Sequence, residues 1–152
     1  MRRTSAIIAI TVALYACQYD PYTSEYATAK PDAVSLIGRW HATQDTLKKL
    51  SGGPYGNLKP SIEVLGDGSI RFEDMPNTWK TLSGEGAGKG ERFAGRWELA
   101  QHQAQWWGLS VSDANWVCSG CLMVLRNRPP HMLVLRYGDP DLGWGYEFER
   151  DG

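Results

Sequence analysis

The feature that most constrains the fold is a series of short segments in which apolar and polar residues alternate. The clearest examples are residues 61–65 and 69–72, in which apolar and polar residues alternate regularly. Such alternation indicates a β-strand, because successive side chains of a strand point to opposite faces. Gly66-Asp67-Gly68 lies between them and is typical of a three-residue hairpin loop, in which Gly68 takes the left-handed conformation. The two segments therefore predict an antiparallel hairpin.

The same pattern recurs near residue 36 and throughout the second half of the chain. The 7 Trp and 17 Gly residues also fit a sheet protein with tight turns. Because closure removes exposed strand edges, we predict an all-β fold, an antiparallel meander of about eight strands in a closed or nearly closed barrel. Besides the hairpin, the expected strands are 36–42, 93–99, 105–112, 121–126, 131–137 and 145–150.

Two intervening regions are expected to be helical or irregular. Residues 45–50 predict one or two helical turns, capped by Asp45 and ended by Gly52-Gly53-Pro54. Residues 73–91 predict a long loop. The glycine-rich run 83–90 within it lacks the Ser or Thr and the following helix of a phosphate-binding loop, so we expect a flexible segment.

A short motif links this pattern to a known architecture. Gly38-Arg39-Trp40 resembles the Gly-x-Trp motif of lipocalin-like (calycin) barrels, in which the tryptophan packs across the closed end of the barrel. From Leu36 to Arg150 the chain also resembles small uncharacterised exported bacterial proteins that share this motif, an Asp-Gly-Ser hairpin and a closing Tyr-x-Phe-Glu-Arg. The resemblance implies a common fold and lends no function.

The first residues are typical of a secretory signal, with Arg2-Arg3 before an uncharged apolar run of about a dozen residues. A membrane-spanning helix needs roughly 20 apolar residues, so this run is too short to span. Leu14-Tyr15-Ala16-Cys17 resembles the lipobox of bacterial lipoproteins, although Tyr15 stands where smaller residues are usual. The resemblance implies cleavage before Cys17, lipidation of its thiol and labelling by palmitate. The alternatives are a buried N-terminal helix and a soluble product cut after Ala27-Thr28-Ala29.

This interpretation divides the chain into a signal peptide at 1–16, a lipidated N-terminus with a flexible tether at 17–35, and a barrel domain at 36–152. Pro and small polar residues without a period are typical of such a tether. We expect the protein in the cell envelope, membrane-anchored on the extracytoplasmic side. Because Gln18 rather than Asp follows Cys17, the resemblance favours the periplasmic face of the outer membrane if the cell has one.

Cys118 and Cys121 remain once Cys17 is assigned to lipid. Their Cys-x-x-Cys spacing matches redox motifs, but those place the first cysteine at a helix N-terminus, whereas strand-like residues flank this pair. Ser119-Gly120 is a two-residue turn, so we expect a structural disulfide across a hairpin mouth, with a redox-active dithiol as the alternative.

The tryptophans fall into two groups. Trp40, Trp97 and Trp107 lie where alternation predicts the core. The others lie opposite the core or near turns, where exposed tryptophan is typical of binding surfaces, and we treat them as candidate ligand- or partner-binding residues: Trp79, Trp106, Trp116 and Trp144.

Other chemistry has little support in the sequence. His41, His102 and His131 lack metal-ligand spacing, and we find no catalytic constellation, so we expect no metal, no cofactor and no enzymatic activity. Removing residues 1–16 leaves 14 basic and 17 acidic side chains, a net charge near −3 that does not favour nucleic acid.

Two functions remain. One is a membrane-anchored barrel that binds an apolar ligand or an envelope component, and the other is a lipid-anchored inhibitor or immunity-type protein that binds a secreted enzyme or toxin. A cavity above about 300 Å³ lined by Trp and aliphatic residues would favour the small ligand.

Overall fold

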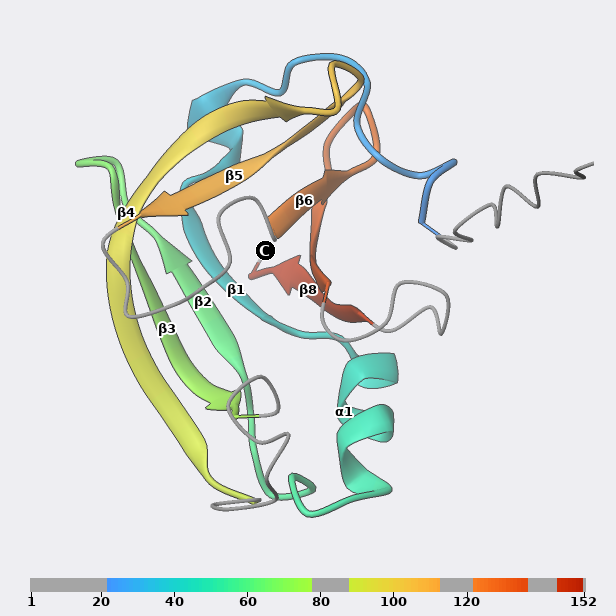
Figure 1. Ribbon diagram of the computed structural model, residues 1–152, viewed down its shortest axis with the longest axis vertical. Helices are drawn as coiled ribbons and strands as arrows, with labels where there is room; N and C mark the ends of the chain where they lie inside the picture. Colours follow the sequence, from blue (N-terminus) through green and yellow to red (C-terminus); the bar gives the residue numbers. More distant parts are fainter. Residues whose placement is uncertain (1–21, 78–87, 113–121, 137–144, 152) are drawn as a thin grey trace, which may run out of the picture.

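The computed structural model describes residues 22–77, 88–112, 122–136 and 145–151 (Figure 1). These residues form one short 3-10 helix, one α-helix and eight strands. In chain order the elements are η1 (Ala33–Leu36), β1 (Gly38–Ala42), α1 (Gln44–Ser51), β2 (Ser61–Val64), β3 (Ser69–Pro76), β4 (Gly90–His102), β5 (Trp106–Ser112), β6 (Leu122–Leu125), β7 (Met132–Arg136) and β8 (Gly145–Arg150). No helix within the described ranges is long and apolar enough to cross a membrane.

The strands form a closed antiparallel barrel in which each strand pairs with its neighbour in sequence. The last strand closes onto the first, with Ala42 of β1 opposite Phe148 of β8. On its other side β1 pairs with β2, where Trp40 lies opposite Ile62. The predicted all-β meander is confirmed, as is its closure into a barrel.

The predicted hairpin joins β2 to β3. Val64 lies opposite Ile70, and Gly68 takes a φ of +81° in the turn, as its position predicted. Asp67 accepts hydrogen bonds through Oδ1 from the backbone N–H of Ser69 at 2.8 Å and from its hydroxyl at 2.6 Å. These two bonds hold the pKa of Asp67 below its usual value.

Part of the predicted loop 73–91 is strand instead. β3 continues to Pro76 and β4 begins at Gly90, so both strands extend beyond the alternating residues that predicted them. A register shift between Phe72 and Met75, with Asp74 at a φ of +52°, interrupts the alternation and explains why the pattern missed the extension.

The predicted helix is present but begins earlier than expected. Its N-cap is Thr43, whose Oγ1 accepts from the backbone N–H of Thr46, whereas Asp45 lies in the first turn. A carboxylate in the first turn still favours the helix, because it faces the positive end of the helix dipole. The prediction of Asp45 as the cap is therefore wrong by two residues.

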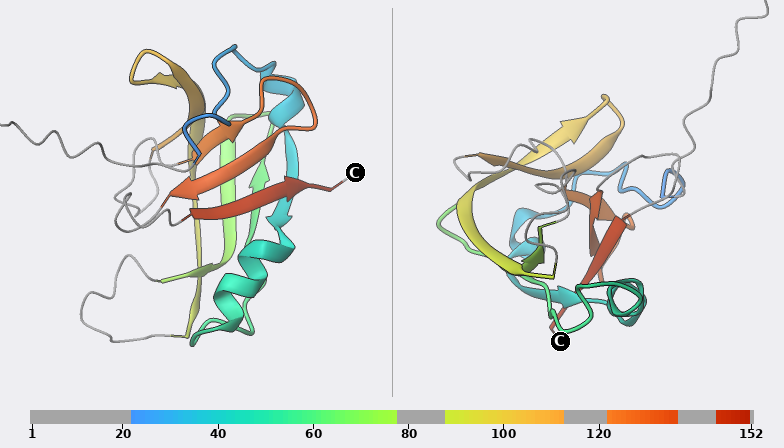
Figure 2. Two further views of the ribbon diagram at one scale, coloured as in Figure 1. Left: turned by 90° about the vertical axis from the view of Figure 1, so that its right-hand side faces the viewer. Right: turned by 60° about the horizontal axis from the view of Figure 1, so that its bottom comes forward.

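Alternation of the strands gives the barrel two distinct rims. We call the rim at which β1, β3, β5 and β7 end the α1 rim, since α1 follows β1 there. The opposite rim carries the hairpins β2–β3, β4–β5 and β6–β7 together with η1, and we call it the η1 rim. Figure 2 shows α1 beside the barrel wall.

Residues 22–36, which we call the strap, pack against the barrel wall, with Tyr26 on its outer side and with Ala27 and Leu36 in the main core. The backbone of Ala27 donates to the carbonyl of Val124 and accepts from the N–H of Trp107, both at 2.8 Å. Thr28 and Ala29 donate to the side chain of Asn127. The strap thus bridges β5 and β6, which within the described residues pair with each other at two positions.

A second apolar cluster lies between the strap and the outer barrel wall. It contains Tyr26 and Met123, Leu125 and Val134, all almost fully buried, with Trp106 packed against them. Residues 22–35 are therefore part of the folded domain and not the flexible tether that the sequence predicted. Burial of Tyr26 and pairing of the strap backbone outweigh the local preference for an extended linker.

Candidate functional site

Most of the predicted site residues lie outside the described part of the chain. They are Cys17, Cys118, Cys121, Trp79, Trp116 and Trp144. The lipidation of Cys17, the disulfide between Cys118 and Cys121, and the recognition role of the three tryptophans stay predictions.

Trp106 is the one predicted binding residue that the structure describes. Its ring centroid lies 5.1 Å from that of Tyr26, at an interplanar angle of 54°. Trp106 lies opposite His102 on β4, and because side chains alternate along β5 it points to the face opposite that of Trp107. Trp106 therefore helps to hold the strap against the wall, and its role in recognition stays a prediction.

Trp40 and Arg150 connect the barrel to η1 at the η1 rim. The indole N–H of Trp40, which is fully buried, donates to the carbonyl of Leu36 at 3.0 Å. Arg150 of β8 donates to the carbonyl of Ser35 at 2.9 Å and lies against Gly38, where an added Cβ would come within 3.0 Å of its guanidinium. Trp40 thus packs against η1.

The barrel interior is mostly apolar in the described strands, although Glu91 and Gln101 lie on the same face of β4 as Phe93 and Leu99. The inward side chains of β6, β7 and β8 are at most 2% exposed, and those of β2 and β3 are equally inaccessible. This set forms most of one continuous core that includes Trp40, Phe72, Leu133, Tyr146 and Phe148.

The inner face of β4 is the exception. Its inward residues Phe93, Trp97 and Leu99 are only half-buried, and so is Trp107 on β5, although all four pack against the core. Phe93 stacks on Phe72 with ring centroids 4.5 Å apart. Trp97 is fixed by its indole N–H, which donates to the carbonyl of Leu65 at 2.9 Å. An accessible apolar strip therefore lines one wall of an otherwise buried interior, and we call Phe93, Trp97 and Leu99 the β4 strip.

Such a strip can bind an apolar molecule through surface burial alone. Each Å² of apolar surface removed from water contributes about 25 cal/mol. The strip offers no carboxylate or amide at its three positions, so it suits a hydrocarbon chain or ring better than a charged group.

Two larger cavities lie on the surface of the described domain. One, of about 480 Å³, lies at the η1 rim between Trp40, Pro129, Pro130 and Arg150. The other, of about 440 Å³, is a groove outside the wall, and its lining includes the carboxylates of Glu25, Asp45, Glu147 and Glu149. Both are above the lower limit of about 300 Å³ expected for a small-ligand site, but the first has Trp40 as its one tryptophan beside Arg150 and Asp151, and the second is lined mainly by polar side chains.

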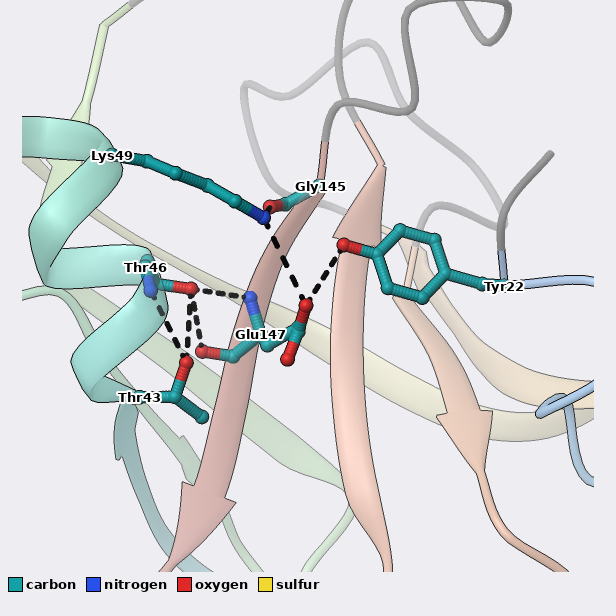
Figure 3. Close-up of polar contacts among 6 residues, drawn as sticks. All are labelled: Tyr22, Thr43, Thr46, Lys49, Gly145 and Glu147. Atoms are coloured by element: carbon teal, nitrogen blue, oxygen red, sulfur yellow. Dashed lines mark hydrogen bonds and ion pairs between the residues drawn. The ribbon is translucent and has the colours of Figure 1, made fainter.

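Glu147 in this groove joins three elements (Figure 3). Its carboxylate accepts from the phenol of Tyr22 in the strap at 2.9 Å and lies 3.8 Å from the ammonium of Lys49 in α1. The Thr46 hydroxyl donates to the Glu147 carbonyl at 3.1 Å and accepts from its backbone N–H at 2.8 Å. These contacts hold α1 and the strap against β8, so Glu147 serves to position both of these elements.

The histidines of the described chain are dispersed. His41 pairs with Asp151 at 2.7 Å and with Glu149 at 3.4 Å, both exposed, while Nδ1 of His131 lies 2.9 Å from the carbonyl of Arg126. His102 has a buried Nε2 without a hydrogen-bond partner, and burial lowers its pKa. Within the described ranges, no group of three or more His, Cys, Asp or Glu residues could hold a metal ion.

Comparison with known proteins adds no assignment to these features. The chain matches no family model, no curated protein and no solved structure.

Proposed function

We propose that this protein is a lipid-anchored lipoprotein of the cell envelope whose barrel binds an apolar ligand against the β4 strip. The observation that carries the proposal is the contrast within the interior. The inward apolar side chains of β2, β3, β6, β7 and β8 are buried by one another, whereas Phe93, Trp97 and Leu99 on β4 are only half-buried within the described part of the chain.

The strip has the capacity for useful affinity. A ligand that removes about 200 Å² of apolar surface from water gains about 5 kcal/mol, before the cost of immobilising it is subtracted. Since Phe93 is paired with β3, and Trp97 and Leu99 are paired with β5, little further ordering of these strands is needed to receive the ligand. The proposed role is therefore binding or carriage, without cofactor and without catalysis.

The anchor is supported by the sequence. A signal-like segment precedes Cys17 in a lipobox-like context, and Cys17 lies five residues before Tyr22, the first residue that the structure describes. Two or more acyl chains on one cysteine would anchor stably, whereas a single chain binds a membrane only marginally. We place the protein on the extracytoplasmic side of the membrane, at the periplasmic face of the outer membrane if the cell has one.

Ligand binding is tested by titrating a fluorescent polyene fatty acid into a soluble chain that begins at Gln18. We expect saturable binding of one probe per chain. Leu99→Gln places an amide on the strip and should weaken binding at least tenfold, equivalent to about 1.4 kcal/mol. The matched control is Glu98→Gln, because Glu98 is exposed on the opposite face of the same strand. Absence of saturable binding to the wild-type chain contradicts the proposal.

The anchor is tested separately by metabolic labelling of the full chain with palmitate. We expect label in the wild-type chain and none in Cys17→Ser. Label that persists in Cys17→Ser refutes the assignment of Cys17 as the lipidated residue.

A further inference from the structure

The cavity at the η1 rim is built from segments that lie far apart in the sequence. It is enclosed by η1, the start of the barrel at β1, the segment that joins β6 to β7, and the end of β8. Its volume of about 480 Å³ lies within the range of sites that hold small molecules. The cavity shares no lining residue with the β4 strip, so a ligand here would occupy a second, separate site.

Three of the lining residues offer apolar surface. Pro129 and Pro130 are exposed, and neither ring carries an N–H. Trp40 contributes its indole ring, because the indole N–H is already bonded to the carbonyl of Leu36 at 3.0 Å. A flat ring or a short hydrocarbon chain would therefore find apolar partners both on β1 and on the segment between β6 and β7.

Arg150 brings a cationic group to the same cavity. Its Nη1 donates to the carbonyl of Ser35 at 2.9 Å, which uses one of the five N–H donors of a guanidinium. Among the described residues Arg150 forms no ion pair, whereas Arg39 and Arg71 each pair with a glutamate at 3.3 Å. The Arg150 side chain is exposed, and the planar fork of a guanidinium matches the two oxygens of a carboxylate.

The carboxylates around the cavity already have partners. Asp151 belongs to the lining, and its Oδ1 lies 2.7 Å from Nδ1 of His41 on β1. Glu149 lies 3.4 Å from the other ring nitrogen of His41, and the side chain of Asp32 accepts from the backbone N–H of Val34 at 3.1 Å. Asp151 is therefore expected to reduce the affinity of an anion at Arg150 without excluding it.

The segment between β6 and β7 is held in place without a ligand. The side chain of Asn127 accepts two hydrogen bonds from the strap backbone, at 2.7 and 2.9 Å. Nδ1 of His131, which is 5% exposed, lies 2.9 Å from the carbonyl of Arg126. The two prolines lie between Asn127 and His131 in the sequence, so little ordering of this wall remains to oppose binding. The exposed Arg126 and Arg128 add positive charge to the same segment.

We propose that the cavity at the η1 rim binds a small organic carboxylate. The carboxylate pairs with the guanidinium of Arg150, and the ring or short hydrocarbon body lies against Trp40 and the two prolines. The charged pair fixes the orientation of the ligand, while the apolar surface contributes by burial. This site goes beyond the proposed function, since it neither uses the β4 strip nor requires the lipid on Cys17.

The test compares 1-naphthoate with 1-naphthylmethanol, which has the same ring system without the charge. Each is titrated by calorimetry into the soluble chain that begins at Gln18 and retains all the described residues. We expect saturable binding of one naphthoate per chain and at least about tenfold weaker binding of the alcohol. Arg150→Met should weaken naphthoate binding about tenfold and leave the affinity for the alcohol within about twofold.

Asp151→Asn tests the same site in the opposite direction. Removal of the carboxylate from the lining should strengthen naphthoate binding about two- to threefold. The matched control is Glu149→Gln, because Glu149 also contacts His41 but does not line the cavity. We expect its affinity to stay within about 1.5-fold of the wild type. These two variants and the pair of probes decide the question if Arg150→Met fails to fold.

Three results would overturn the inference. They are a wild-type chain without saturable naphthoate binding, equal affinity for naphthoate and the alcohol, and equal effects of Asp151→Asn and Glu149→Gln. The two sites are separated by Leu99→Gln, which should lose the fatty-acid probe and bind naphthoate as the wild type does. Naphthoate binding that is lost in Leu99→Gln but kept in a folded Arg150→Met chain would place the carboxylate at the β4 strip and refute a site at the η1 rim.

Discussion

Removal of the Tyr26 ring should lower the free energy of unfolding of the domain by about 3–4 kcal/mol. The Tyr26 side chain is 2% exposed and packs in the outer cluster against Trp106, Met123, Leu125 and Val134. Truncation of a buried aromatic side chain to alanine typically costs about 3–5 kcal/mol, as lost transfer free energy plus the cavity left behind. We choose the lower part of that range because one side of the cluster is the strap, which can partly collapse onto the wall.

The measurement is urea denaturation of the chain that begins at Gln18, comparing wild type with Tyr26→Ala. With an m-value near 2 kcal/mol/M, the expected loss lowers the midpoint by about 1.5–2 M. The control is Ser24→Ala, an exposed position in the same strap, for which we expect a change within about 0.5 kcal/mol. A loss below about 1 kcal/mol for Tyr26→Ala would mean that the strap behaves as a tether, and the account of residues 22–36 would fail.

Three further predictions concern single positions. Trp40→Phe removes the donor to the carbonyl of Leu36 and leaves that carbonyl without its hydrogen bond. Thermal unfolding should therefore show a decrease of about 1–3 kcal/mol in the free energy of unfolding, and an unchanged melting temperature would contradict the contact. Gln103 and Ala104 take φ values of +51° and +55°, so replacing them with Asn-Gly should raise stability in urea by about 1 kcal/mol or more, and a decrease would refute the turn geometry. Burial lowers the pKa of His102 below its unfolded value of 6.5, because the folded protein favours the neutral imidazole. The resulting stabilisation is fully present above pH 6.5 and is lost as the pH falls through the lower pKa of the folded state. In His102→Gln the free energy of unfolding should therefore decrease less steeply than in the wild type as the pH is lowered. The same pH dependence in both chains would contradict the lowered pKa.

The sequence predicted the barrel because each strand carries its own signal. Alternation located all eight strands, most of them to within a few residues, and the Gly68 turn was recognised from its position alone. Alternation fails where the backbone departs from a regular strand, as at the irregularity near Asp74, which hides the end of β3. The helix start was misplaced because Thr43 and Asp45 are both good caps and only the strand end at Ala42 decides between them.

The strap could not be recognised from local composition. Its Pro, Ser and Thr residues are typical of a linker, and its stability comes from contacts with residues about 80 to 125 positions away in sequence. Two tyrosines four residues apart, Tyr22 and Tyr26, were the available signal for a packed segment. The β4 strip was equally hidden, because alternation identifies which side chains face inward but not how completely the opposite wall covers them.

The central claim, an apolar ligand on the β4 strip, is tested most directly by native mass spectrometry of the full chain isolated from its own membranes in mild detergent. We predict one apolar adduct per chain, released by organic solvent and identified as a lipid, present in Glu98→Gln and lost in Leu99→Gln. A wild-type chain that carries no such adduct, or a Leu99→Gln chain that retains it at the wild-type level, would contradict the account.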